Sequence, residues 1–190
     1  MDLKSYITES IETKKKILNN DKIITTIEDI ADLIIKAYKK DKKVLTAGNG
    51  GSAGDAQHIV GELISKVFID RPALSAIALT TNTSVITAVS NDFGYEYVFA
   101  RQIQANAKEE DIFIAISTSG NSENVIKALE VAKSKGVITV GLTGESECKM
   151  DNLCDYIIHV PSKITPIIQE SHIMISHIIC ALVEKAIYKI

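Results

Sequence analysis

The sequence predicts an α/β protein of three layers, in which a five-stranded parallel sheet lies between two layers of helices. From Lys43 onward, short β-rich runs alternate with stretches of helical periodicity, which is the pattern of βα units and a parallel sheet. Before Lys43 the chain shows helical periodicity alone, and one long helical stretch closes it. These observations predict N-terminal helices, an α/β core and a long C-terminal helix.

Two helices are expected in the first forty residues. The first carries Leu3, Ile7 and Ile11 on one face. The second has a row of apolar residues on one face: Ile23, Ile27, Ile30, Leu33, Ile34 and Ala37. The polar run Asn19-Asn20-Asp21 separates the two helices and is predicted to cap the second.

The core is expected to contain five strands, four connecting helices and the closing helix. The strands are predicted at Val44–Ala47, Ser75–Leu79, Ile112–Ser117, Val137–Leu142 and Tyr156–Val160. The helices are predicted at Ser52–Lys66, Thr83–Ser90, Tyr97–Ala107, Ser122–Lys135 and Thr165–Tyr188. Since neither a linker nor an internal repeat interrupts the pattern, we expect one domain over residues 1–190, with a helical extension at 1–40 and the remainder at 41–190.

The composition is that of a soluble globular protein. The 190 residues are 46% hydrophobic and 24% charged, with a mean hydropathy of +0.12. Lys and Arg number 21 against 24 Asp and Glu, so the chain lacks the basic balance that nucleic-acid binding requires. Apolar runs such as Ile112–Ile116 are far shorter than the roughly 20 residues that span a bilayer, and the N-terminus lacks a signal-peptide block. We expect a cytoplasmic protein that binds neither nucleic acid nor membrane.

The cysteines and aromatic residues exclude further classes of protein. Cys148, Cys154 and Cys180 are an odd number without CxxC spacing, which fits a reducing compartment and argues against a thiolate zinc site. We interpret all three as small core residues. Trp is absent and only 5% of residues are aromatic, which weighs against a lectin-like module.

The first predicted strand runs into a glycine-rich polar loop, Gly48-Asn49-Gly50-Gly51-Ser52-Ala53-Gly54-Asp55. Its glycines permit close backbone approach, and the helix after it offers free N–H groups to an anion. The loop satisfies G-x-G-x-x-A, the loose dinucleotide fingerprint. The acidic residue expected after the second strand is missing, because Leu79 is followed by Thr80-Thr81-Asn82-Thr83. A dinucleotide site is therefore disfavoured.

The third predicted strand is followed by a hydroxyl-rich loop, Ser117-Thr118-Ser119-Gly120-Asn121-Ser122-Glu123-Asn124. Its hydroxyls and glycine at a helix N-terminus can surround a phosphate with neutral donors. The structural alternative is an ordinary turn in which Ser or Thr caps the helix. Because both polar loops follow strands of one parallel sheet, they favour a small phosphoester ligand at its carboxyl edge.

Four histidines are candidates for chemistry, and two of them have neighbouring side chains that could share a metal ion or a proton with them. His58 and Glu62 are four residues apart, so they project from one helical face at a metal-ligand spacing that is also a common surface pairing. In the closing helix, Gln169 lies about 60° from His172 on one side and about 80° from His177 on the other, so spacing alone does not choose between the histidines. His159 is interpreted as structural.

Four motifs occur in order along the chain: GNGGSAGDAQHIVGEL, Asn91-Asp92, ISTSGNSENV and IQESHIMISH. In order and separation they resemble the bacterial phosphoheptose isomerases of the sugar isomerase (SIS) fold, over nearly the whole chain. That resemblance implies a flavodoxin-like sheet, homotetramers with active sites shared between subunits, and one zinc ion per subunit. It also implies the first step of nucleotide-activated heptose biosynthesis for surface polysaccharide, either lipopolysaccharide or capsule.

The resemblance also implies a role for individual residues. The phosphate of the substrate would be bound by Ser117, Thr118, Ser119 and Ser122. The sugar pocket would be lined by Asn49, Gly50, Gly51, Ser52, Asn91 and Asp92, together with Glu62 and Gln169. Zinc would be held by His58, Glu62, Gln169 and His177, which selects His177 over His172.

The expected reaction converts sedoheptulose 7-phosphate to D-glycero-D-manno-heptose 7-phosphate through an enediol. We expect Glu62 and His177 to be the acid–base pair, with Glu62 removing the proton at C1. The alternative is a non-catalytic SIS protein that binds sugar phosphates or a replication initiator. One departure is that many relatives carry an arginine directly before the IQE-like stretch, and some an acid before that, where this chain has Ile167 and Pro166.

Overall fold

A computed structural model describes residues 2–189, so the two ends of the predicted domain, residues 1 and 190, lie outside the described residues. The strands are β1 Val44–Gly48, β2 Ala76–Ala78, β3 Ile112–Ile116, β4 Ile138–Thr143 and β5 Tyr156–His159. They form one parallel sheet in the order β2-β1-β3-β4-β5. This is the flavodoxin-like order, whose topological switch point lies between β1 and β3. The predicted five-stranded parallel sheet is confirmed.

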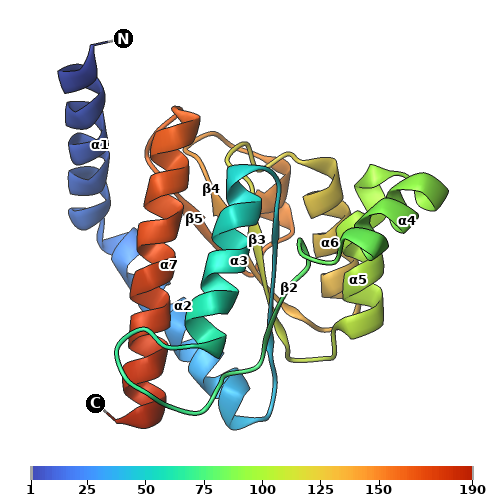
Figure 1. Cartoon of the computed structure of the whole chain (residues 1–190). Coiled ribbons are helices and arrows are strands. Elements are labelled where there is room, and N and C mark those ends of the chain that lie inside the picture. The colour runs from blue at the N-terminus through green and yellow to red at the C-terminus, as the bar shows by residue number, and fades with distance from the viewer. Residues whose placement is uncertain (1, 190) are drawn as a thin grey trace.

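Helices cover both faces of the sheet (Figure 1). The α-helices are α1 Leu3–Leu18, α2 Asp21–Lys39, α3 Gly51–Ile64, α4 Thr83–Phe93, α5 Val98–Asn106, α6 Glu123–Ser134 and α7 Thr165–Tyr188. Two short 3-10 helices, η1 Tyr95–Tyr97 and η2 Lys149–Asn152, complete the described elements. The three-layer prediction with two N-terminal helices and a long C-terminal helix is therefore confirmed.

Two apolar clusters divide the core between the faces of the sheet. Along β3, Ile112, Ile114 and Ile116 belong to the cluster that α2, α3 and α7 cover, whereas Phe113 and Ala115 belong to the cluster that α5 and α6 cover. The alternation follows from the two-residue period of a strand. All five β3 residues are buried, as expected for a strand with helices on both sides.

Helix starts follow side-chain caps that the sequence displays. Asn20 caps α2 by accepting a hydrogen bond from the N–H of Ile23, and Asn82 caps α4 by accepting from the N–H of Val85. The predicted cap at Asn19-Asn20-Asp21 is thus confirmed. Pro166 lies in the first turn of α7, where proline is favoured, and Ile167 is buried. Both departures from the family pattern therefore have structural roles at the start of α7.

The observed elements correct some predicted boundaries. α4 continues from Thr83 past Ser90 to Phe93, so Asn91 and Asp92 lie in its last turn. The helix expected at Tyr97–Ala107 is α5, Val98–Asn106, and Tyr97 belongs instead to η1, which follows Gly94, whose φ of +101° allows the chain to turn. The interpretation of the cysteines holds for Cys180, which is buried, but Cys148 and Cys154 are only partly buried.

α7 is long and apolar enough, by length and composition, to cross a membrane. Half of its most apolar window is buried inside the protein, and the helix packs against α2 and α3. A core helix passes the same compositional test. Packing inside the protein therefore accounts for the apolar character of the buried half of α7.

Candidate functional site

The first polar loop turns sharply from β1 into α3. Gly50 has a φ of +55°, a left-handed conformation that favours glycine. A Cβ at Gly48 would lie 2.6 Å from the carbonyl oxygen of Ser52, and one at Gly51 would lie 2.6 Å from Nε2 of Gln169. Glycine is therefore needed for α3 to begin close to β1 and for Gln169 to lie against its first turn.

The N-terminus of α3 has free donors. Its N-cap residue is Gly50, and within residues 2–189 no side chain caps it. The first N–H groups of a helix have no partner inside the helix, and the helix dipole makes this end attractive to an anion. The loop can therefore hold an electronegative group, as the sequence predicted.

The second polar loop gathers hydroxyl groups at the end of β3. Ser117 Oγ lies 3.0 Å from Ser122 Oγ and 3.4 Å from Ser119 Oγ. Gly120 has a φ of +63°, and a Cβ there would lie 2.2 Å from Sγ of Cys148. The carbonyl of Thr118 accepts a hydrogen bond from the N–H of Gly144 at 3.1 Å, which fixes this loop to the end of β4.

Of the structural alternative for this loop, a local turn is present, since Ser119 Oγ accepts a hydrogen bond from the N–H of Asn121 at 3.2 Å, but the helix cap is absent among residues 2–189. Ser122 is the N-cap residue of α6, yet among the described residues its side chain makes no capping hydrogen bond to the helix. Its hydroxyl points instead toward Ser117. The first N–H groups of α6 and three converging hydroxyls are thus available together to a phosphate.

The two polar loops meet at the switch point between β1 and β3. Asn49 and Asn124 exchange two side-chain hydrogen bonds, each 2.9 Å long. The hydroxyl of Tyr95 donates to Oδ1 of Asn49 at 3.0 Å. A shallow pocket lies beside them, lined by Asn49, Tyr95, Glu96, Ser122, Glu123, Asn124 and Lys127. The predicted meeting of both loops at one edge is observed.

Asn124 and Tyr95 are site residues that the sequence reasoning missed. Asn124 closes the hydroxyl-rich loop, so its position was a usable signal, whereas nothing local marks Tyr95 as a partner of Asn49. The predicted pair Asn91 and Asp92 is exposed in the last turn of α4, where Asn91 Nδ2 donates to Asp92 Oδ1 at 2.9 Å. This pair lies three and four residues before Tyr95 and contacts neither loop through any hydrogen bond within residues 2–189.

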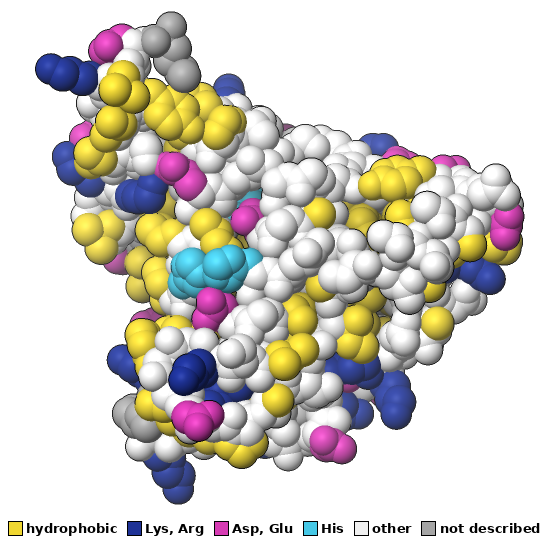
Figure 2. Space-filling model, viewed as in Figure 1, with side chains coloured by type: hydrophobic (Ala, Val, Ile, Leu, Met, Phe, Trp, Pro, Cys, Tyr) yellow, Lys and Arg dark blue, Asp and Glu magenta, His cyan; other side chains and the backbone are white. Residues whose placement is uncertain are grey.

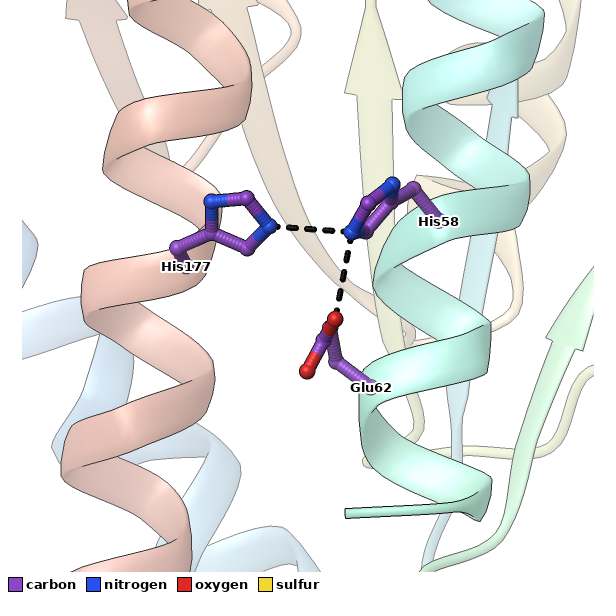
Figure 3. Close-up of side chains that lie close together, drawn as sticks. All are labelled: His58, Glu62 and His177. Atoms are coloured by element: carbon purple, nitrogen blue, oxygen red, sulfur yellow. Dashed lines mark hydrogen bonds and ion pairs between the residues drawn. The ribbon is translucent and has the colours of Figure 1, made fainter. Parts of the chain in front are cut away.

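A second cluster lies where α3 and α7 run side by side (Figure 3). His58 Nε2 lies 2.9 Å from His177 Nε2 and 3.1 Å from Glu62 Oε1. The imidazole rings meet edge to face, with centroids 4.8 Å apart. Figure 2 shows histidine side chains at the surface on this side of the molecule. Both histidines are exposed and Glu62 is partly buried, so small molecules have access to them.

The cluster fits a metal ion. One ligand atom from each of His58, Glu62 and His177 lies within 4.8 Å of the other two. Nε2 of His58 faces both Glu62 and His177. One proton on this nitrogen cannot form equally good hydrogen bonds to both partners, whereas a metal ion between the three side chains can bind all of them. Two histidines and a carboxylate with an open fourth side are the donor set of many catalytic zinc sites.

The structure shows which histidine of α7 joins the cluster, a choice that residue spacing alone could not make. His177 joins His58 and Glu62, whereas His172 is buried and its Nε2 lies 3.1 Å from the carbonyl oxygen of Thr143. Burial lowers the pKa of His172 to about 4, so it is neutral at pH 7. Its Nδ1 has no hydrogen-bond partner among residues 2–189. His159 contacts Asp151 and the carbonyl of Gly144, in line with its structural interpretation.

Gln169 is the predicted metal ligand that lies apart from the cluster. Its side-chain amide lies against Gly51, and Gln169 precedes His177 by eight residues, about 12 Å of helix. Gln169 thus lies between the first polar loop and the histidines. The structure brings three of the four predicted ligands together and places the fourth at the loop.

Asp55 is a further carboxylate on the same face of α3, one turn before His58. Its Oδ2 is buried without a hydrogen-bond partner among the described residues. Burial raises the pKa of Asp55 to about 6, although the nearby His58 opposes the shift. Raised carboxyl pKa values cluster at functional sites. The spacing Asp55, His58, Glu62 was visible in the sequence, but the missing partner was not.

The chain is similar to known proteins over nearly its whole length. A family model described as SIS domain matches residues 5–144. A phosphoheptose isomerase of Aneurinibacillus thermoaerophilus is 58% identical over 187 residues, which are 98% of this chain and 94% of that protein. Phosphoheptose isomerase 2 of Campylobacter jejuni is 54% identical, with 98% of this chain and 92% of that protein covered.

Similarity extends to three dimensions. The solved structure of a phosphoheptose isomerase from Francisella tularensis matches with a TM-score of 0.93 at 35% sequence identity, and the match covers 96% of both chains. A phosphoheptose isomerase structure from Neisseria gonorrhoeae matches with a TM-score of 0.90, also at 35% identity, over 96% of this chain and 97% of that one.

Proposed function

This chain belongs to the phosphoheptose isomerases of the SIS domain family, and on that premise we propose that it converts sedoheptulose 7-phosphate to D-glycero-D-manno-heptose 7-phosphate. The enzyme is then an aldose–ketose isomerase of heptose biosynthesis. The observation that carries this proposal is the convergence of His58, Glu62 and His177 in a protein whose helix α3 starts from the first of two loops that can bind a sugar phosphate. A protein that only binds sugar phosphates would not require this acid–base cluster.

The phosphate end of the substrate is assigned to the second polar loop. Its binding residues are Ser117, Thr118, Ser119 and Ser122, and the N-terminus of α6 adds free N–H donors. The sugar hydroxyls are assigned to Asn49, Gly50, Gly51, Ser52, Asn91, Asp92, Glu62 and Gln169. Binding energy from the unreactive phosphate then orients C1 and C2 at the other end of the sugar.

The acid–base chemistry is assigned to Glu62 and His177. Glu62 removes the proton from C1 while His177 protonates the oxygen on C2, which yields the enediol. Return of a proton to C2, with removal of the proton from the oxygen on C1, yields the aldose. Both side chains lie at one point between α3 and α7, each within 3.1 Å of Nε2 of His58.

One zinc ion per subunit is proposed, with His58, Glu62, His177 and Gln169 as the residues that would hold it. Bound there, zinc would supply a Lewis acid that polarises the carbonyl of the sugar. Three of these side chains already converge, and Gln169 would have to turn from Gly51 toward them. Glu62 and His177 would each have to release the metal while they take up or donate a proton.

The test is NMR of the purified protein in D2O with sedoheptulose 7-phosphate, beside a fructose 6-phosphate sample and a chelator-treated sample. We expect the aldoheptose 7-phosphate to form and its formation to stop when zinc is removed. Glu62→Gln should lower kcat by about 10²- to 10⁴-fold, the usual contribution of a general base, while substrate still binds. Near-normal turnover by this variant would remove Glu62 from the mechanism.

Glu130→Gln, an exposed carboxylate of α6, is the matched control and should leave turnover unchanged. A second control separates the alternative of a non-catalytic sugar-phosphate or replication-initiator binder. If folded, zinc-loaded protein binds the ketose without converting it, that alternative replaces the isomerase.

We also propose a cytoplasmic homotetramer with shared active sites and no nucleic-acid or membrane partner. Support comes from large apolar side chains exposed on α1 and beside His177 on α7: Leu3, Ile7, Ile11, Ile178 and Leu182. In Figure 1, α1 projects from the body of the protein, and Figure 2 shows hydrophobic side chains along it. Analytical ultracentrifugation should give four chains per particle; a monomer at micromolar concentration would refute this assembly.

A further inference from the structure

A buried ion pair joins the segment after α3 to the last turns of α7. Nε of Arg71 lies 2.8 Å from Oε2 of Glu184, and the two side chains are 1% and 0% exposed. The residues are 113 positions apart in the sequence. A buried ion pair is stable only where the remaining hydrogen-bonding groups of both side chains also have partners. The other partners of Arg71 and Glu184 therefore show which parts of the chain the pair holds in place.

Glu184 binds the backbone of the connection that follows α3. Its carboxylate accepts hydrogen bonds from the N–H groups of Val67, Phe68 and Ile69, at 2.9, 2.7 and 3.3 Å. Burial alone would raise the pKa of Glu184, but these donors and Arg71 outweigh burial and hold that pKa at about 2. Glu184 is therefore an anion at any working pH.

Arg71 binds the C-terminal end of α3 itself. Its Nη2 donates to the carbonyl oxygen of Glu62 at 2.8 Å, and its Nη1 donates to that of Leu63 at 2.7 Å. The last carbonyl groups of a helix have no partner inside the helix. Neither the C-cap residue Ser65, with a φ of −85°, nor the next residue Lys66 has a positive φ, so the left-handed cap that usually satisfies them does not form. The guanidinium supplies a donor to the carbonyl of Glu62 and a second donor to that of Leu63, which also accepts from the N–H of Leu74 at 3.1 Å, and it adds a favourable positive charge.

The position of Glu62 makes this cap important for the chemistry. α3 ends at Ile64, so Glu62 lies in the turn that would fray without a cap. Glu184 belongs to α7, which also carries His177 two turns earlier. The pair thus fixes the last turn of the helix that bears Glu62 to the helix that bears its partner.

We propose that Arg71 and Glu184 are positioning residues, which hold Glu62 in register with His58 and His177. This inference rests on the role proposed for Glu62 in the isomerase. It assigns to a pair of buried residues a function at a cluster whose side chains neither of them contacts through a hydrogen bond in the described part of the chain, since Arg71 binds Glu62 only at its backbone carbonyl.

The test uses the full-length protein and the variant Arg71→Lys. Lysine keeps the charge but cannot donate to two carbonyls and a carboxylate in the fork geometry of arginine. We expect kcat and zinc affinity each to fall about tenfold or more, because a small misplacement of a reacting group or of a ligand's support has effects of this size. KM and the affinity for inorganic phosphate should change less than twofold, since the hydroxyl-rich loop lies elsewhere.

Arg101→Lys is the matched control, since Arg101 is the chain's other arginine, is exposed on α5 and contacts the ring of Phe93. Amide exchange at Ser65, whose N–H bonds to the carbonyl of Gly61 at 2.9 Å, should be faster in Arg71→Lys and unchanged in Arg101→Lys. Glu184→Gln, which keeps shape and loses charge, should show the same pattern to a smaller degree.

Three results would overturn the proposal. Folded Arg71→Lys could keep kcat and zinc affinity within twofold of Arg101→Lys. The losses in kcat could be matched by equal losses in phosphate affinity, which indicates general damage. Both Arg71→Lys and Glu184→Gln could fail to fold, which assigns the pair to folding alone. If the wild-type protein proves inactive as an isomerase, zinc affinity and exchange at Ser65 still decide the positioning role separately.

Discussion

The contact between Gly51 and Gln169 gives a prediction that distinguishes glycines that only weaken helix α3 from a glycine that the candidate site requires. α3 contains three glycines, at positions 51, 54 and 61. Within residues 2–189, a Cβ at Gly54 or Gly61 would meet nothing within 4 Å, whereas a Cβ at Gly51 would lie 2.6 to 2.8 Å from the amide atoms of Gln169. Alanine at the three positions therefore tests one chemical change in two environments.

The expected magnitudes follow from these surroundings. Gly54→Ala and Gly61→Ala should each stabilise the protein by up to about 1 kcal/mol, the difference in helix propensity between the residues. For a chain of this size that raises Tm by about 2–4 °C. Gly51→Ala should gain nothing, because its Cβ would lie well inside the separation of about 3.5–4.0 Å at which atoms attract. Since Gln169 is flexible, it would move away rather than unfold the helix.

The assay is thermal unfolding of the three variants together with zinc affinity and isomerase kinetics. Gly51→Ala should have a Tm at or slightly below that of the wild type, with weaker zinc binding and a raised KM. The other two variants should keep wild-type kinetics at a higher Tm. If Gly51→Ala is stabilised as much as Gly54→Ala and its zinc affinity and KM are unchanged, then Gln169 is not held against α3 in a functional position.

Two titratable groups, the half-buried Asp55 and the buried His172, predict opposite dependences of stability on pH in metal-free protein. The pKa of Asp55 is raised from 3.8 to about 6, so the folded state binds more protons between those values and loses stability as pH rises through them. Asp55→Asn should therefore be more stable than the wild type at pH 7, by about 1 kcal/mol once solvent screening is allowed for. Below about pH 4 the two proteins should be equally stable. Equal midpoints of urea unfolding at pH 7 would contradict this prediction. The pKa of His172 is lowered from 6.5 to about 4, so the folded state loses stability as pH falls through that range. Relative to the wild type, His172→Gln should gain about 2 kcal/mol in free energy of unfolding between pH 7 and pH 5. Urea unfolding at both pH values measures this gain, and a stability difference that is the same at both would rule out His172 as the titrating group.

Much of the fold follows from local patterns in the sequence. The runs at Val44–Ala47 and Ile112–Ile116 are apolar throughout, and a strand covered by helices on both faces needs that composition. The cap at Asn20 and the hydroxyl-rich loop at the end of β3 are likewise encoded within a few residues. Such features depend on interactions between near neighbours in the chain, so they can be predicted without tertiary structure.

The spacing of His58 and Glu62 also predicted a shared helical face, and the two side chains do meet. Their third partner could not be chosen in this way. His172 and His177 lie about 140° apart around α7, so the rotation of α7 against α3 decides which of them reaches the cluster. That rotation is set by the packing of the whole apolar face of α7 and not by any short motif.

Contacts between distant segments were decided by tertiary structure alone. Asn49 meets Asn124 because β1 and β3 are neighbours at the switch point, and Arg71 meets Glu184 because α7 returns across the end of α3. The fold also decides that Oδ2 of Asp55 lacks a hydrogen-bond partner among residues 2–189, since a missing hydrogen bond leaves no mark on residue spacing. The sequence by itself determined the elements and the chemistry available at their ends; the fold determined which of those groups are brought close enough to act together, because long-range packing sets distances that local patterns do not contain.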